Sequence, residues 1–223
     1  LCVGLGGDAS TAGKSGAYVV IDEEDLTVVH EARDSAVPIS LVRFSPEGET
    51  LAVGTDDGSI YLYAVMDEYE LIGRCVRHKD PVRSVDFSVD GEWLRSNSDG
   101  NDLCFFNSDD ASYQSNLASM RDVRWASVTC KYTWHTQNVH RTAYAGEAVR
   151  NLHAPAPSSK FVGVGTNYGY ISLFPLPTQH PEARSRRTLA HCGEVAGFNF
   201  SFDGKRLITC GTRDRCIVQW DVK

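Results

Sequence analysis

The 223-residue sequence predicts an all-β fold made of repeated sheets. Three segments share one pattern: residues 42–65, 85–107 and 198–222. Each contains a short apolar strand, a tight turn, a second strand, a polar turn and a third strand. Aromatic residues recur at intervals of 43, from Phe44 to Phe87 and from Tyr63 to Phe106. Four-stranded units that repeat every 40–45 residues are typical of WD-repeat β-propeller blades, so we predict that fold.

The elements follow from local sequence. Strand segments such as "SIYLYAV" and "CIVQWDV" are rich in β-branched and aromatic residues, which suits packed sheets. Gly48, Gly91 and Gly204 occupy the first turn of the three clear units, where a positive φ is often needed. A degenerate unit covers residues 147–177, and a partial unit opens the chain. No segment has a convincing helical period.

We predict a single WD-repeat propeller region over residues 1–223, with about five four-stranded blade units. The units are expected at about 1–36, 37–79, 80–125, 140–191 and 192–223, with an inter-blade insertion at about 110–146. Five units alone would expose apolar sheet faces at both ends. We therefore expect a fragment of a longer chain, partnered by upstream propeller blades, and consider a closed five-bladed ring the less favoured alternative.

Composition excludes several classes of protein. Hydrophobic residues make up 42% and charged residues 23%, as in soluble globular domains. The net charge of −7 disfavours general binding to nucleic acid or to an anionic membrane. Seven cysteines without C-x-x-C spacing argue against a disulfide framework or a zinc site. We expect buried thiols in a reducing cytosol.

The stretch "GLGGDASTAGKSG", residues 4–16, is close to a phosphate-binding loop. Gly13, Lys14 and Ser15 match the end of G-x-x-x-x-G-K-[ST], but the first glycine position holds Asp8, and Gly7 comes one residue early. Such a loop must lead into a helix, whereas "AYVVIDEEDLTVVHEA" indicates two strands around an acidic turn. We predict a loop between strands and reject an NTP-dependent enzyme.

The last unit carries the polar pattern of a WD-repeat blade. By analogy, His191 before the first strand, Asp214 in the second turn and Trp220 in the third strand would form a hydrogen-bonded network. The usual Ser or Thr position falls on Cys210, so we expect an incomplete network. Buried polar groups need partners, which predicts a structural role for His191.

The other units depart further from the pattern. His78 fits the histidine position, but Gly100 occupies the Asp position and Phe106 replaces Trp. In the unit before it, Asp57 and Tyr63 hold the equivalent positions. We expect these blades to depend more on apolar packing.

No catalytic arrangement is evident in the sequence. His135 and His140 lack a carboxylate partner at metal-ligand spacing, and a Gly-x-Ser-x-Gly elbow is missing. We predict a protein that is not an enzyme, with no catalytic residue, no metal and no cofactor.

Residues 121–140, "RDVRWASVTCKYTWHTQNVH", carry a more specific signal. Together with "LVRFSPEGETLAVGTDDGSIYLY" and "VDFSVDGEWLRSNS", this segment resembles the echinoderm microtubule-associated-protein-like family. The matching positions are Arg121, Asp122, Trp125, Ala126, Thr129, Cys130, Trp134 and His135. The resemblance runs from about residue 17 to 223 and implies the C-terminal part of the second of two atypical propellers.

The resemblance implies a scaffold that binds tubulin or microtubules of the cytoskeleton, in the cytoplasm, with the cilium and spindle as candidate locations. Tubulin is acidic and so is this chain, so a local basic patch is needed. "EARSRR" supplies Arg184, Arg186 and Arg187 in a predicted loop between strands.

An alternative function is a generic WD-repeat adaptor that assembles a protein complex, such as a ubiquitin ligase or a signalling complex. Aromatic and arginine residues anchor such interfaces, and Tyr168, Tyr170 and Trp134 are candidates. A pull-down from cytosol separates the two hypotheses by whether tubulin is the dominant partner.

Overall fold

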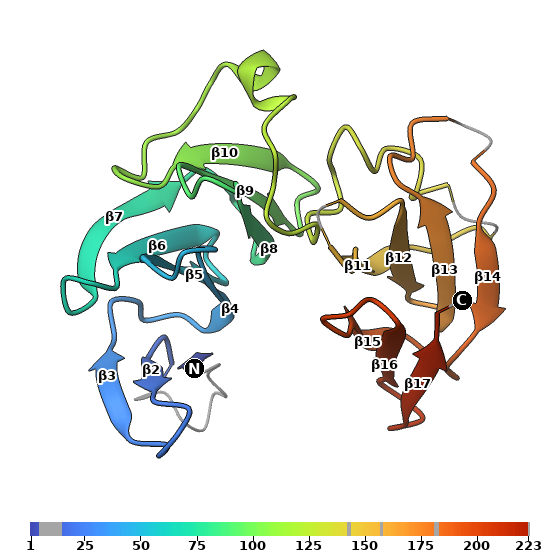
Figure 1. Ribbon diagram of the computed structural model, residues 1–223, viewed down its shortest axis with the longest axis horizontal. Coiled ribbons are helices and arrows are strands. Elements are labelled where there is room, and N and C mark those ends of the chain that lie inside the picture. The colour runs from blue at the N-terminus through green and yellow to red at the C-terminus, as the bar shows by residue number, and fades with distance from the viewer. Residues whose placement is uncertain (5–14, 142–143, 157, 181–182, 223) are drawn as a thin grey trace. The chain divides into compact units, whose positions relative to one another are not determined.

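The computed structural model describes residues 1–4, 15–141, 144–156, 158–180 and 183–222, most of them in β-strands and the turns that join them (Figure 1). The described residues form five antiparallel sheets of three or four strands. Within each sheet, strands that are consecutive in sequence lie side by side. The chain divides into two compact units, Leu1–Arg124 and Trp125–Lys223.

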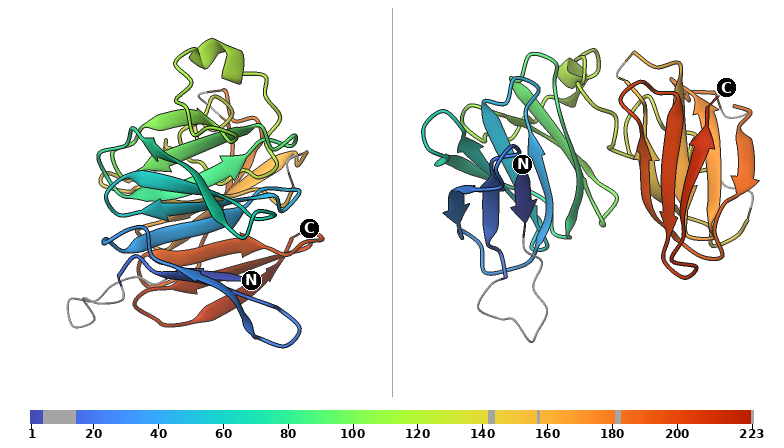
Figure 2. Two further views of the ribbon diagram at one scale, coloured as in Figure 1. Left: turned by 90° about the vertical axis from the view of Figure 1, so that its left-hand side faces the viewer. Right: turned by 60° about the horizontal axis from the view of Figure 1, so that its bottom comes forward.

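The first unit contains three sheets, which the left-hand view of Figure 2 shows one above another, coloured from blue to green. Its first sheet consists of β1 (Cys2–Gly4), β2 (Tyr18–Ile21) and β3 (Val28–Ala32). Its second sheet consists of β4 (Ile39–Phe44), β5 (Thr50–Thr55), β6 (Ser59–Ala64) and β7 (Glu70–Val76). Its third sheet consists of β8 (Val82–Phe87), β9 (Trp93–Ser98) and β10 (Leu103–Asn107), and is followed by the short 3₁₀ helix η2 (Leu117–Met120).

The second unit begins with a linker, residues 125–148, and continues with two sheets. One consists of β11 (Val149–His153), β12 (Phe161–Thr166), β13 (Tyr170–Pro175) and β14 (Arg186–Leu189). The other consists of β15 (Val195–Phe200), β16 (Arg206–Gly211) and β17 (Ile217–Asp221).

Three of the hydrophobic cores lie between neighbouring sheets. Tyr18 and Val20 of β2 pack against Leu51 and Tyr63 of the second sheet. The second sheet packs in the same way on the third, and the sheet β11–β14 packs on the sheet β15–β17. A single blade cannot bury its apolar face alone, so stacking of successive blades provides the core. The prediction of an all-β propeller fold is confirmed.

Turn glycines have the conformation that the sequence predicts. Gly48, Gly91 and Gly204 have φ angles of 78°, 75° and 67°. Gly169, between β12 and β13, also has a positive φ of 81°, and a Cβ there would lie 2.0 Å from the carbonyl oxygen of His191. Only glycine allows this close approach of one turn to the chain that enters the next sheet.

The glycine-rich stretch is only partly described, because residues 5–14, with Gly7, Asp8, Gly13 and Lys14, lie outside the described residues. Ser15 and Gly16 form a turn, after which β2 and β3 flank the acidic turn at residues 22–27. A strand therefore follows Ser15, as predicted, where a phosphate-binding loop requires a helix.

The cysteines differ in part from expectation. All seven are free thiols, and Cys75, Cys104 and Cys130 are buried. Cys192 and Cys216 are exposed, so the expectation of buried thiols is wrong for them. Both lie at turns beside Asp214, where the chain runs along the surface. Over the described parts of the chain, no helix is long and apolar enough to cross a membrane.

Candidate functional site

The structure brings His191, Asp214 and Trp220 together at the last sheet. Nδ1 of His191 lies 2.9 Å from Oδ2 of Asp214, and Nε2 lies 2.9 Å from the hydroxyl oxygen of Thr209. The indole N–H of Trp220 donates to the same hydroxyl at 3.0 Å. The network is therefore complete, so the expectation of an incomplete network is wrong, because Thr209 and not Cys210 occupies the hydroxyl position. Adjacent residues of a strand point to opposite faces, so Thr209 faces the network and Cys210 faces away.

Asp214 also ties two chain segments together. Its carboxylate accepts the backbone N–H groups of Cys192 at 3.1 Å and of Cys216 at 3.2 Å. The hydrogen bond from Cys216, together with those from Cys192 and His191, lowers the pKa of Asp214 below its usual value. An ionised carboxylate with these partners fixes the turn between β16 and β17 to the segment that enters β15.

His78 forms the corresponding network of the third sheet. Its Nδ1 lies 2.6 Å from Oδ2 of Asp102, and its Nε2 lies 2.7 Å from the hydroxyl of Ser96. The assignment of the Asp position to Gly100 is therefore wrong. The turn between β9 and β10 places the carboxylate two residues later, at Asp102, which spacing alone did not indicate. Phe106 pairs with Leu94 as Trp220 pairs with Leu207, but offers no hydrogen bond.

Asp57 has a different role in the second sheet. It accepts the hydroxyl of Thr55 at 2.6 Å and the backbone N–H of Ser59 at 3.0 Å, and so closes its own turn. Arg74 forms a salt bridge to it at 3.0 Å. Tyr63 instead donates its hydroxyl to Asp34 at 2.8 Å.

His78, Asp102 and Cys104 offer three possible metal-ligand atoms within 4.8 Å of one another. Both ring nitrogens of His78 are already hydrogen-bonded, one to Asp102 and one to Ser96. Burial raises the pKa of the Cys104 thiol to about 11, which keeps it protonated and a poor ligand. The cluster is better explained as a structural hydrogen-bond network.

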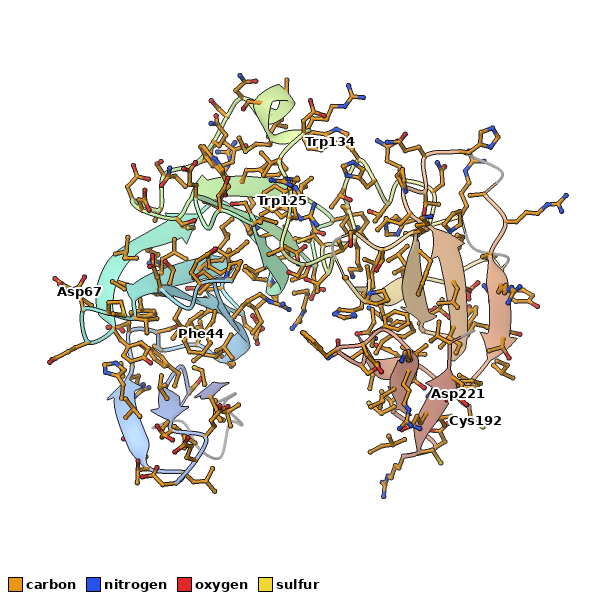
Figure 3. All side chains as sticks on the ribbon, viewed as in Figure 1. Phe44, Asp67, Trp125, Trp134, Cys192 and Asp221 are labelled. Atoms are coloured by element: carbon orange, nitrogen blue, oxygen red, sulfur yellow. The ribbon has the colours of Figure 1, made fainter. Side chains whose placement is uncertain are left out.

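Five of the positions that match the family pattern, Arg121, Asp122, Trp125, Trp134 and His135, divide between the two units. Arg121 and Asp122 follow η2 and are exposed, at the end of the first unit. Trp125, at the start of the second unit, is buried, and Trp134 and His135 are half-buried; both tryptophans are labelled in Figure 3. These aromatic residues are thus mostly covered within the fold.

The linker packs on the sheet β11–β14. Val128 and Val139 join a core with Val162 and Phe174. The backbone N–H of Thr178 donates to the carbonyl of His135 at 2.7 Å, which ties the linker to the segment after β13. The linker therefore covers one face of this sheet, which gives its sequence pattern a packing role.

The three candidate contact arginines do not form one exposed patch. Arg186 and Arg187 belong to strand β14, so the predicted loop at these positions is wrong. Pairing with β13 makes this segment the outer strand of its sheet, and consecutive residues point to opposite faces. Arg184 and Arg186 are exposed, whereas Arg187 bonds Glu147 at 2.6 Å and lies 3.8 Å above the ring centre of Tyr170.

A groove of about 740 Å³ opens at one end of the two sheets of the second unit. Its lining includes Tyr144, Arg150, Tyr168, Tyr170, Glu194 and Arg213. Sequence reasoning singled out Tyr168 and Tyr170 but missed Arg150 and Arg213. The sequence around these two arginines gives little indication of a site, since each is an ordinary charged residue at a strand end or in a turn.

Comparison with known proteins decides the family. The family model described as "Echinoderm microtubule-associated protein second beta-propeller" matches residues 1–222. The chain belongs to this family. The resemblance noted in the sequence is thereby confirmed, and it covers the propeller strands as well as the linker.

Two relatives illustrate the similarity within the echinoderm microtubule-associated protein family. The 77 kDa echinoderm microtubule-associated protein of Lytechinus variegatus is 32% identical over 213 residues, covering 93% of this chain and 32% of the relative. Echinoderm microtubule-associated protein-like 1 of Homo sapiens is 30% identical over 213 residues, covering 93% of this chain and 26% of the relative. The chain thus spans about a quarter to a third of the length of these relatives.

Solved structures support the propeller fold of this family member. A chain of a structure titled "Crystal Structure of Mitotic Checkpoint Complex" gives a TM-score of 0.73 at 18% identity, covering 99% of this chain and 70% of that chain. The β-propeller domain of Cps50 (Swd1) from Myceliophteria thermophila gives a TM-score of 0.61 at 15% identity, covering 83% of this chain and 65% of that chain. At these identities the similarity concerns the fold alone.

Proposed function

We propose that this chain is a propeller region of a non-enzymatic scaffold protein that binds tubulin or microtubules of the cytoplasmic cytoskeleton. The observation that carries the proposal is the match to an echinoderm microtubule-associated protein propeller over residues 1–222. The histidines of the blade networks support a structural rather than a catalytic role, because His78 and His191 each bond a carboxylate and a hydroxyl. Both nitrogens of each ring therefore have a partner within the fold, and these contacts hold the turns in place.

The proposal extends to the organisation of the protein. We propose that residues 1–223 form one propeller region with blade units near the predicted boundaries, and that further blades belong to the same protein. The greater length of the relatives supports this, since this chain covers 32% of one and 26% of another.

Exposed arginines provide a candidate contact. With a net charge of −7, the chain as a whole repels an acidic partner, so attraction must be local. Arg184 and Arg186 are exposed and lie near and on the outer strand β14. Arg187 is left out of the contact, because its half-buried side chain is held between Glu147 and the ring of Tyr170.

Co-sedimentation with stabilised microtubules tests the proposal. The purified protein is expected in the pellet, and the double variant Arg184→Glu/Arg186→Glu is expected to bind about tenfold more weakly, since exposed charge contacts contribute up to about 1 kcal/mol each. Lys205→Glu, an equal charge reversal per site at the turn between β15 and β16, is the control.

The possible outcomes separate the parts of the proposal. Protein that stays in the supernatant contradicts microtubule binding, and undiminished binding of the double variant removes the arginines as contacts. A cytosolic pull-down rich in other proteins but without tubulin would favour the generic adaptor.

A further inference from the structure

The groove of the second unit is built from one end of two neighbouring sheets. The turn that joins β12 to β13, the segment that enters β15 and the turn that joins β16 to β17 all reach it. Antiparallel register places these chain segments at the same end of their strands. Its volume of about 740 Å³ is within the range of about 300–1,000 Å³ typical of ligand sites.

Three tyrosines form its aromatic surface. The rings of Tyr144 and Tyr170 lie 5.7 Å apart, and the guanidinium of Arg187 lies 5.3 Å and 3.8 Å from their centres. Glu147 holds Arg187 by an ion pair of 2.6 Å. Tyr168, which is 44% exposed, donates its hydroxyl to the carbonyl of Ala145 at 3.2 Å. These rings are fixed before any partner arrives, which lowers the entropic cost of binding.

The neutral polar side chains of the groove shape its loops. Asn167 donates to the carbonyl of Gly146 at 3.0 Å and accepts the backbone N–H of Ala148 at 2.7 Å. Thr212 donates to the carbonyl of Glu194 at 3.2 Å. The side chains of Asn167 and Thr212 therefore spend most of their hydrogen-bonding capacity within the protein. Recognition of a polar ligand in this groove then depends mainly on its charged side chains.

Two arginines supply that charge. Nε of Arg150 lies 3.3 Å from a carboxylate oxygen of Glu194, with both side chains over a third exposed. Arg213 is exposed, and its stem lies along Gly193, where a Cβ would come within 2.9 Å of Cδ. Two arginines and one glutamate give the lining a positive balance in a chain whose net charge is −7. The charge of the groove is therefore opposite to that of the whole chain.

We propose that this groove binds an extended peptide segment that carries aspartate or glutamate side chains. Arg213 and Arg150 pair with the carboxylates, and the tyrosines pack against the adjacent peptide backbone and side chains. The open shape suits a chain that passes through it. Nucleic acid is disfavoured, since a run of phosphates needs more cations than two arginines beside a glutamate provide. The inference goes beyond microtubule association, because it names a site and a ligand chemistry that do not require tubulin.

Fluorescence anisotropy with two labelled peptides tests the proposal on the intact protein. One peptide alternates Gly and Glu around a central Tyr, and the other has Gln at every Glu position. The acidic peptide is expected to bind in a salt-sensitive manner, at least about tenfold more tightly than the Gln peptide. Arg213→Glu is expected to weaken binding of the acidic peptide at least about tenfold, and Arg213→Gln about threefold. Tyr168→Ala is expected to weaken binding of both peptides, because it removes a packing surface rather than a charge. Lys205→Glu, at the opposite end of the sheet β15–β17, is the matched control and should bind as the parent does.

Equal affinity for both peptides would overturn the proposal, as would equal weakening by Lys205→Glu and Arg213→Glu. Microtubule co-sedimentation of the same variants keeps the two proposals distinguishable. Peptide binding without co-sedimentation contradicts the proposed function alone, and co-sedimentation without peptide binding contradicts the groove alone.

Discussion

At the scale of single residues, Thr209 is the point on which the last sheet's polar network converges. The carboxylate of Asp214 can only accept, so Nδ1 of His191 carries the hydrogen of that bond, and Nε2 of the same ring lies 2.9 Å from the Thr209 hydroxyl. The same oxygen accepts the indole N–H of Trp220. Thr209 is fully buried, so water cannot replace either bond. One hydroxyl thus satisfies two large side chains from different strands.

Replacing Thr209 tests this arrangement. Thr209→Val keeps the shape but leaves a ring nitrogen of His191 and the indole N–H of Trp220 without partners, at a cost of about 2–4 kcal/mol in the free energy of unfolding. Urea unfolding measures the loss. Cys210→Ser, one residue along and outside the network, is expected to change stability by less than about 1 kcal/mol. Similar losses in both variants would contradict the role assigned to Thr209.

At the scale of elements, strand β12 shows how one sheet serves two cores. Its sequence "FVGVGT" alternates valine with glycine. Val162 and Val164 pack with the linker residues Val128 and Val139. Gly163 and Gly165 face the next sheet, where a Cβ on Gly163 would lie 2.4 Å from the ring of Phe198. The glycine face therefore makes room for an aromatic residue of β15.

The linker that covers the valine face contains a titratable contact. His140 stacks on Tyr132 at 4.6 Å and donates a ring N–H to the carbonyl of Lys131 at 3.0 Å. Burial lowers the pKa of His140 below its ordinary value of 6.5, and the charge of Lys131 adds to this, while the hydrogen bond opposes it. The folded state therefore favours the neutral ring more than the unfolded state does.

The pH dependence follows from that sign. Stability from His140 is fully present above about pH 6.5, the unfolded pKa, and is lost as the pH falls through the lower folded pKa. The urea midpoint of the second unit is expected to fall between about pH 7.5 and pH 5. His140→Phe keeps the stacking and removes the titration, so its midpoint should depend less on pH. Parallel pH profiles for parent and variant would refute the assignment.

The element scale also shows where sequence patterns stop being informative. Repeat spacing locates most strands, but "RSRR" at residues 184–187 predicts a loop, because it has neither apolar alternation nor a β-branched residue. Its last two residues instead begin β14. Pairing with Tyr170–Leu173 of β13 makes it a strand. An outer strand can be polar on both faces, since the inner strands supply most of the apolar surface.

At the scale of the whole molecule, stability is distributed over several cores, and within each of the two units a core joins neighbouring sheets. Phe87 is 1% exposed and shares a core with Leu62, Cys75 and Phe106, which come from two sheets of the first unit. These two sheets of the first unit therefore depend on each other, as expected for repeat architectures.

Removing Phe87 tests this dependence. Phe87→Ala is expected to cost about 3–5 kcal/mol and to reduce amide hydrogen-exchange protection in β4–β7 and β8–β10 together. Phe202→Ala, at a fully exposed aromatic residue in a turn, is the control and should stay within about 0.5 kcal/mol of the parent. Loss of protection confined to β8–β10 would mean that the two sheets are not stabilised through a shared core.

By itself, the sequence determined the all-β class, the repeat, the turn glycines and the family, because each depends on spacing and on local backbone preference. Tertiary structure alone decided that Thr209 and Asp102 complete the polar networks, that Arg187 pairs with Glu147, and that Arg150 and Arg213 share a groove. Arg187 and Glu147 are 40 residues apart in sequence, and only strand pairing and sheet stacking bring such groups within hydrogen-bonding distance. Distances of that kind are set by the packing of whole sheets, which a single sequence does not display.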